Sequence, residues 1–309
     1  MNARFQVPAM CRKRLLTGDE VVAWLLVTPW IAGFLAFHLG PILASLGLSL
    51  TEWPLLAAPK WIGLANYHTM IFNDPLVGRA LKVTTMYAVT SVPLHVAFGL
   101  AVALLLNQQV KGLALMRTIY YLPSCVSGVS VALLWLWVFS GDYGLINSVL
   151  RLVGIQGPYW LLDTRTVLPA FVIMSLWGVG GGIVIYLAAL QGVPSELYEA
   201  AEVDGAGSWV RFWRITLPMI SPVLFFQAVM GLINAFQVFA GPFIMTRGGP
   251  ANASLFFMLY LYQNAFEFFQ MGYASALAWV LFVYILALTI IVFRSSALWV
   301  YYENELKGR

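Results

Sequence analysis

The run 272-GYASALAWVLFVYILALTIIVF-293 contains no charged residue over its 22 positions. A helix needs roughly 20 mostly apolar residues to cross the hydrocarbon core of a bilayer. The apolar residues are continuous and do not alternate with polar ones, which is typical of a spanning helix and not of a barrel strand. This stretch therefore predicts an integral membrane protein.

The composition of the whole chain agrees with that prediction. Of its 309 residues, 61% are hydrophobic and 10% are charged, and the mean hydropathy is +0.82. Soluble domains carry about 25% charged residues. Two cysteines are too few for a disulfide-stapled fold. The 17 basic residues form no stripe with interleaved aromatic residues, so we expect no nucleic-acid partner.

Five further apolar stretches are long enough to span the bilayer, which predicts an all-α fold with six transmembrane helices. They cover residues 21–50, 81–106, 118–140, 167–190 and 219–245. The first is expected to bend at Pro29 and at the Gly40-Pro41 pair. The resulting organisation is a tail over 1–20, a six-helix transmembrane domain over 21–293, and a second tail over 294–309.

The basic residues between the spans predict the orientation of the chain. If the amino terminus is cytoplasmic, eleven basic residues fall on the cytoplasmic side and six on the other side. Cytoplasmic loops carry an excess of lysine and arginine. We therefore expect both termini to be cytoplasmic.

Ionisable residues at membrane depth are scarce. All 13 acidic residues fall outside the predicted spans, and the only candidates at membrane depth are His38 and His95. Ion-coupled carriers need such groups to bind their driving ion. The chain also lacks a Gly-x-x-x-x-Gly-Lys-Ser/Thr loop for nucleotide phosphates. If it moves a solute uphill, we expect the energy to come from another chain.

The fourth predicted span contains a glycine cluster, Trp177-Gly-Val-Gly-Gly-Gly182. The Gly178–Gly182 spacing favours close packing of helices. The missing side chains around Gly180 and Gly182 also favour a cavity beside Trp177. The two interpretations are compatible, and they make Trp177, Gly180 and Gly182 candidates for a substrate path.

The fifth predicted span carries two neutral amides, Asn234 and Gln237, which are three residues apart and are expected on one helical face. They can form hydrogen bonds between helices, or they can line a path for a hydroxyl-rich solute, because amides both donate and accept. Pro242 is expected to unwind the helix nearby. Both roles stay open for these residues.

Between the fourth and fifth spans lies the loop 194-PSELYEAAEVDGAGSWVRFWRITLP-218. A short helix is predicted from Ser195 to about Asp204, because Pro194 and Ser195 suit a helix start and acidic residues follow near its positive end. Gly205 and Gly207 are expected to stop it. From these residues alone, an ordinary interfacial connector is an equal alternative.

The spacing Glu199-Ala200-Ala201, three residues, Gly205, nine residues, Ile215-x-Leu217-Pro218 resembles the loop signature of permease subunits in binding-protein-dependent ABC importers. Other segments are similar to carbohydrate-uptake permeases of the maltose-importer type, in particular to the first of the two permeases. These segments are Trp61-Ile-Gly-Leu-Ala-Asn-Tyr67, Asp142-Tyr-Gly-Leu-Ile-Asn147, Gly248-Gly-Pro250 and Trp299-Val-Tyr-Tyr-Glu303.

The resemblance implies a type I importer fold in a bacterial or archaeal plasma membrane, and a loop that docks on a cytosolic ATPase. The ATPase-coupling residues would be Glu199, Ala200, Ala201, Asp204, Gly205, Leu217 and Pro218. Implied partners are a second permease in a heterodimer, an ABC ATPase dimer that holds ATP and magnesium, an extracytoplasmic solute-binding protein, and membrane lipid. This chain itself would be a transport subunit and no enzyme, with no cofactor or metal of its own.

The leading hypothesis is therefore a permease for a neutral sugar, oligosaccharide or polyol. Within the same class, the rivals are importers of glycerol phosphate, amino acids, phosphate or metals, although charged solutes normally call for an opposite charge or exposed helix ends near the midplane. An ion-coupled carrier is a weaker alternative. A membrane enzyme has no catalytic constellation on one side of the membrane to support it.

Overall fold

The computed structural model of the protein describes residues 18–108 and 111–301. Most of the predicted 1–20 tail, Cys11, and the predicted tail beyond residue 301 lie outside the described residues. Within the described residues, four helices are long and apolar enough to cross a membrane, or up to six if each of two bent helix pairs counts as one span. The prediction of an all-helical membrane fold is therefore confirmed.

The first half of the described chain contains a small two-stranded antiparallel sheet among helices, and the second half is helical. The elements of the first half are α1 (Gly18–Phe34), the π-helix η1 (Leu35–Leu39), α2 (Gly40–Ser49), β1 (Thr51–Glu52), β2 (Lys60–Trp61), α3 (Ala65–Phe72), α4 (Pro75–Leu106), α5 (Leu113–Tyr121), the 3-10 helix η2 (Leu122–Cys125), α6 (Gly128–Val138) and α7 (Leu145–Leu152). Those of the second half are α8 (Val167–Leu176), α9 (Gly180–Gln191), α10 (Ser195–Val203), α11 (Ser208–Arg211), the π-helix η3 (Phe212–Thr216), α12 (Leu217–Phe236), α13 (Ala240–Met245), α14 (Phe257–Tyr262), the π-helix η4 (Gln263–Glu267) and α15 (Met271–Ser296).

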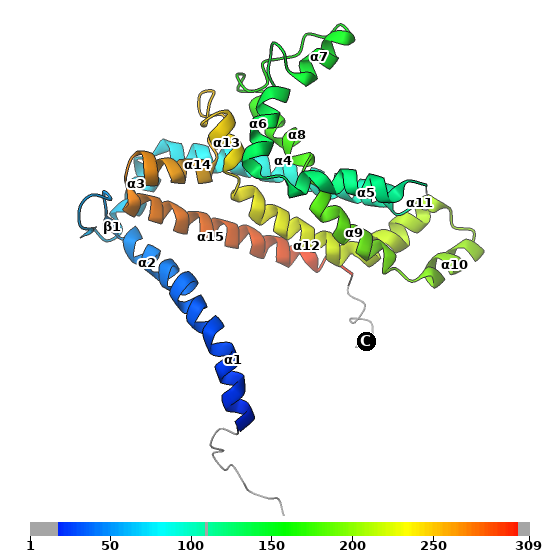
Figure 1. Ribbon diagram of the computed structural model, residues 1–309, viewed down its shortest axis with the longest axis horizontal. Coiled ribbons are helices and arrows are strands. Elements are labelled where there is room, and N and C mark those ends of the chain that lie inside the picture. Colours follow the sequence, from blue (N-terminus) through cyan, green and yellow to red (C-terminus); the bar gives the residue numbers. More distant parts are fainter. Residues whose placement is uncertain (1–17, 109–110, 302–309) are drawn as a thin grey trace, which may run out of the picture.

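The centre of the bundle is formed by three long helices, α4, α12 and α15, which run side by side in Figure 1. Helix α4 packs against α8, α9 and α12, and α15 packs against α2 and α12. One buried cluster, which includes Phe171, Phe256 and Leu277, lies where α4, α8, α14 and α15 meet. A second cluster, which includes Ala103, Ile183 and Ile220, joins α4, α9 and α12 near the 194–218 loop.

The first predicted span forms one long helical segment, Val22–Ser49, whose α2 part packs against α15 while α1 extends away from the bundle (Figure 1). No residue in its most apolar window is buried. Its π-helical segment ends at Leu39; the amide of the next residue, Gly40, donates to the Leu35 carbonyl, and Pro41 follows directly. The helix therefore accommodates the Gly40-Pro41 pair through a wider turn, as π-bulges do in other helices.

The third predicted span, over 118–140, is helical but sharply bent. Helical residues Leu113–Cys125 and Gly128–Val138 meet at an angle of 103°. Pro123 lies in η2 just before the bend. Ser127 then has extended backbone and its hydroxyl accepts from the Ser130 amide, so it caps a new helix start. The chain changes direction because one helix ends at Cys125 and the next is capped by Ser127.

The fourth and fifth predicted spans are also interrupted, although less sharply. The fourth bends by 50° between Leu176 and Gly180. In the fifth, α12 ends at Phe236 and α13 begins at Ala240. Pro242 has no amide hydrogen to donate to the carbonyl four residues earlier, so the interruption over 237–239 agrees with the expected unwinding near Pro242. The sixth predicted span corresponds to α15.

Candidate functional site

The 194–218 loop forms α10 at the end of the bundle opposite β1 (Figure 1). The helix ends in a Schellman motif: the Ala206 amide donates to the Ala201 carbonyl at 2.8 Å, and the Gly205 amide donates to the Glu202 carbonyl at 3.0 Å. Gly205 has a φ of +74°, a conformation that glycine adopts without steric cost. The predicted short helix and its stop at Gly205 are confirmed.

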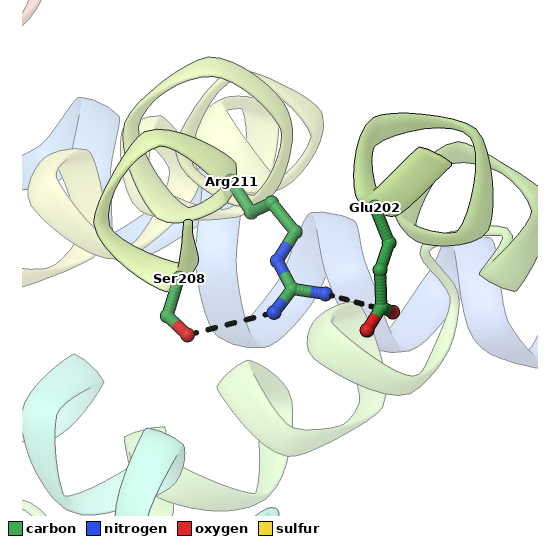
Figure 2. A network of polar contacts seen from close by, with 3 residues as sticks. All are labelled: Glu202, Ser208 and Arg211. Carbon is green, nitrogen blue, oxygen red and sulfur yellow. Dashed lines mark hydrogen bonds and ion pairs between the residues drawn. The ribbon is translucent and has the colours of Figure 1, made fainter. Parts of the chain in front are cut away.

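The outer surface of this loop is open to contact by another molecule. Glu199, Ala200, Asp204 and Gly205 are exposed, and Ala201 is half-buried. The loop contains the one salt bridge of the described residues, in which Arg211 Nη1 lies 3.4 Å from Glu202 Oε2 (Figure 2). Glu199 forms no salt bridge in the described part of the chain, so its exposed carboxylate is available to a partner molecule.

The loop is joined to the bundle at its base. The hydroxyls of Tyr198 on α10 and Thr216 before α12 lie 2.9 Å apart in a hydrogen bond. Leu217 and Pro218, at the start of α12, are half-buried, and Ile220 is in the core. The exposed part of α10 is thus connected through Tyr198 and Thr216 to the first turn of α12.

A polar cavity of about 240 Å³ lies among α4, α8, α9 and α12. It contains hydroxyl, amide and imidazole groups and no acidic residue, lysine or arginine. The polar side chains that line it are Tyr87, Ser91, His95, Ser175, Tyr186, Gln227 and Asn234. Hydroxyls and amides both donate and accept hydrogen bonds, so this lining is suited to an uncharged, hydroxyl-rich ligand.

Two of the five predicted path residues line this cavity, namely Gly182 and Asn234. Gly180 instead packs against the main chain of α5, since a Cβ there would lie 2.3 Å from the Tyr120 carbonyl oxygen. Trp177 forms an edge contact with Trp135 at a ring distance of 6.2 Å. Both interpretations of the glycine cluster therefore apply: Gly180 allows close helix packing, and Gly182 borders the cavity.

Asn234 and Gln237 do not share one face of a regular helix, so that expectation is wrong. Helix α12 ends at Phe236, and Gln237 follows it with non-helical backbone. Both residues are exposed, but Asn234 lines the cavity and Gln237 does not. Because α12 ends at Phe236, Gln237 does not occupy the helical position beside Asn234 that the three-residue spacing predicts.

Sequence reasoning missed most of the cavity wall. On α4, Tyr87, Ser91 and His95 recur at every fourth position, and on α12 Gln227 precedes Asn234 by seven. Both spacings place polar side chains on one helical face. A search for polar residues at these spacings within the apolar spans could have found them.

A second polar cluster lies at the opposite end of the bundle, around Asp74. Its carboxylate accepts hydrogen bonds from the Leu76 amide at 3.0 Å and from the hydroxyls of Tyr260 and Tyr273 at 2.5 and 2.6 Å. These groups border a cavity of about 640 Å³ between α3, α14 and α15. Asp74 thus caps α4 and fastens two other elements to it.

The bent spans, the polar cavity and the exposed loop helix define a helical membrane protein with a solute-sized space among its spans. Residues 95–301 match the family described as the binding-protein-dependent transport system inner membrane component. The chain belongs to this family. This confirms the prediction of a transport subunit of the permease type.

Several named relatives are similar over nearly their whole length. The chain is 43% identical to the probable ABC transporter permease protein YesP of Bacillus subtilis, over 96% of this chain and 97% of that protein. It is 35% identical to the lactose transport system permease protein LacF of Rhizobium radiobacter, over 90% and 94%. It is 31% identical to the arabinooligosaccharides transport system permease protein AraP of Halalkalibacterium halodurans, over 92% of each.

A solved structure has the same fold. The chain superimposes with a TM-score of 0.77 and 26% identity on a subunit of a bacterial ABC transporter involved in the import of the acidic polysaccharide alginate. The match covers 90% of this chain and 96% of that chain. The predicted fold of an ABC importer permease is therefore confirmed.

Proposed function

We propose that this chain is one permease subunit of an ATP-driven importer for a sugar, oligosaccharide or polyol without charge. It works with a second permease in a heterodimer, a cytosolic ATPase dimer that binds ATP and magnesium, and an extracytoplasmic solute-binding protein. Both termini and the 194–218 loop face the cytoplasm. The surplus of basic residues on that side supports this orientation.

The observation that carries the proposal is the continuity of the loop with the cavity wall. Helix α12 starts at Leu217, where the loop ends, and carries Gln227 and Asn234 into the cavity. Its base is tied to α10 through the Tyr198–Thr216 hydrogen bond. A partner that moves α10 would therefore move two polar groups of the cavity with it.

The loop surface suits a docking role. Glu199 offers an exposed charge for a basic residue on the ATPase, and Ala200 and Ala201 allow close approach of the two surfaces. Asp204 and Gly205 form the exposed turn after the helix, and Leu217 and Pro218 begin the span that receives the motion. These seven residues form the proposed coupling element.

The chemistry of the cavity supports the substrate class. Its lining has hydroxyl and amide groups without carboxylate, ammonium or guanidinium groups. The names of LacF and AraP refer to lactose and to arabinooligosaccharides, which are hydroxyl-rich solutes. Gly182 and Asn234 are the proposed path residues inside the cavity, with Trp177, Gly180 and Gln237 beside it.

The test is uptake by the complete transporter reconstituted in vesicles with its ATPase and binding protein. Glu199→Lys should abolish ATP-dependent uptake and weaken binding of the ATPase, because it places a positive charge where a basic partner residue is expected. Glu196→Lys is the matched control, since Glu196 is exposed on the same helix outside the signature. It should transport normally.

Normal transport by Glu199→Lys would reject the coupling role. Uptake by this chain without nucleotide, driven by the membrane potential alone, would instead establish an ion-coupled carrier and overturn the proposal.

A further inference from the structure

A groove of about 730 Å³ lies between α4 and α8, and the proposed transport function does not use it. Three basic side chains border it, Arg79, Lys82 and Arg165, and all three residues are exposed. Below them the groove is lined mainly by apolar side chains, among them Met86, Leu168, Pro169 and Ile173. We call this feature the α4–α8 groove.

The positive charges of the groove are not compensated within the described part of the chain. None of the residues that line it is acidic. Arg79 donates through Nε to the Asn252 carbonyl at 3.3 Å, which leaves its charge unpaired. The nearby Asp163 carboxylate binds the Arg165 backbone amide and forms no salt bridge with the guanidinium. The groove therefore favours an anion.

The position of the basic residues along the helices matches a membrane interface. Arg79 and Lys82 lie within the first eight residues of α4, and Arg165 lies two residues before α8. From that level both helices continue into apolar sequence. Cations at the ends of spans lie at the headgroup level, and the apolar part of the groove extends from there toward the hydrocarbon.

The groove and the polar cavity share no lining residue. On α4, Met86 and Thr90 line the groove, whereas Ser91 and His95 line the cavity. An occupant of the groove would therefore lie outside the proposed solute path.

We propose that the α4–α8 groove binds one anionic phospholipid. The phosphate group lies among Arg79, Lys82 and Arg165, and an acyl chain follows Met86, Leu168 and Ile173. A ligand with a charged head and an apolar tail satisfies both parts of the lining, whereas a soluble acidic oligosaccharide would cover the apolar part with hydroxyl groups. This proposal does not depend on the identity of the transported solute.

The test is native mass spectrometry of the full-length chain, purified with its partners in mild detergent and titrated with phosphatidylglycerol or phosphatidylcholine. The wild type should prefer phosphatidylglycerol. The double variant Lys82→Gln/Arg165→Gln should bind phosphatidylglycerol at least fivefold more weakly and should no longer prefer it to phosphatidylcholine. Arg79 is unchanged in this variant and keeps its hydrogen bond to Asn252. Lys60→Gln/Arg247→Gln is the control, because both residues are exposed and neither lines the groove. It should bind like the wild type.

A second variant tests the acyl-chain part without a change in charge. Ile173→Trp should fill the groove and weaken phosphatidylglycerol binding, and Val89→Trp, an exposed apolar position on α4 outside the lining, should not. Equal binding of the two lipids by the wild type, or equal losses in groove and control variants, would overturn the proposal. Displacement of the lipid by an acidic oligogalacturonide, but not by glycerol phosphate, would assign the groove to a sugar acid and overturn it as well.

Discussion

The Tyr273 hydroxyl donates a hydrogen bond of 2.6 Å to the carboxylate of Asp74, 199 positions earlier in the chain. The same carboxylate oxygen accepts from Tyr260 at 2.5 Å. One acidic side chain therefore joins the starts of α4 and α15 and the helix α14 at the end of the bundle away from the 194–218 loop. Hydrogen bonds to a charged acceptor are stronger than those between neutral groups.

Replacement of Asp74 should destabilise the protein. Asp74→Ala removes the cap of α4 and leaves two tyrosine hydroxyls without their acceptor, at a cost of about 2 to 4 kcal/mol in the free energy of unfolding. Thermal unfolding of the purified chain in detergent should show a lower Tm. Asp142→Ala is the matched control, because Asp142 also accepts from a tyrosine, Tyr159, but in an exposed loop. A similar loss in both variants would contradict a special role for Asp74.

Three consecutive glycines at the start of α9 should respond differently to alanine. Gly180→Ala should destabilise the protein by about 1 to 3 kcal/mol, because the new Cβ would lie 2.3 Å from a backbone oxygen. Gly181→Ala meets no atom within 4 Å and should be neutral or slightly stabilising. Thermal unfolding of these two variants measures the difference.

Gly182→Ala should separate transport from stability. Its Cβ would lie 2.7 Å from Gln227 Nε2, the free end of a side chain that can move into the cavity. The unfolding free energy should change by less than about 1 kcal/mol, and solute uptake by the reconstituted transporter should fall. Uptake equal to that of Gly181→Ala would show that this cavity is not the solute path.

Gly205→Ala should impair coupling through the backbone alone. No atom lies within 4 Å of the new Cβ, but a φ of +74° costs an L-residue about 1 to 2 kcal/mol. ATP-dependent uptake should decrease, and Gly205→Asn should retain more activity, since asparagine tolerates this conformation better. Gly207→Ala is the control, with a φ of −66° and equally open space. If both alanine variants lose uptake equally, the turn geometry is not the cause.

The Glu202–Arg211 pair should matter little for stability. Exposed ion pairs contribute about 0 to 1 kcal/mol, and 74% of the Glu202 side chain is accessible. Glu202→Gln should leave Tm nearly unchanged in both low and high salt. A large drop in Tm at low salt alone would indicate that the pair holds the loop.

The number of apolar segments and the loop helix were predictable because both depend on local sequence. The 194–218 loop has its start signals, its exposed helix and its Gly205 stop within a few residues. The sharp bend after Cys125 was not predicted, because mean hydropathy does not report direction. Pro93 and Pro222 lie inside continuous helices, so Pro123 alone does not predict a break. The additional signal is Ser127, which caps the next helix.

The cavity was predicted only in part, because its walls come from three separate regions of the chain. Asn234 and Gly182 were found from their own chemistry. His95 was considered as an isolated residue. Ser91 and Tyr87 are recognisable as parts of the same polar wall only after the packing of α4 against α9 and α12 is known. The position of Gln237 depends on where α12 ends, and residue spacing does not define that point.

The exposure of α1 has a consequence for how the protein is made. The span Val22–Ser49 has no buried residue in its most apolar window, so its insertion does not depend on the packing of other helices. Anchoring of this span is therefore separable from tertiary folding: α1 can enter the bilayer as an independent unit, whereas the helices of the bundle reach their positions by packing against one another.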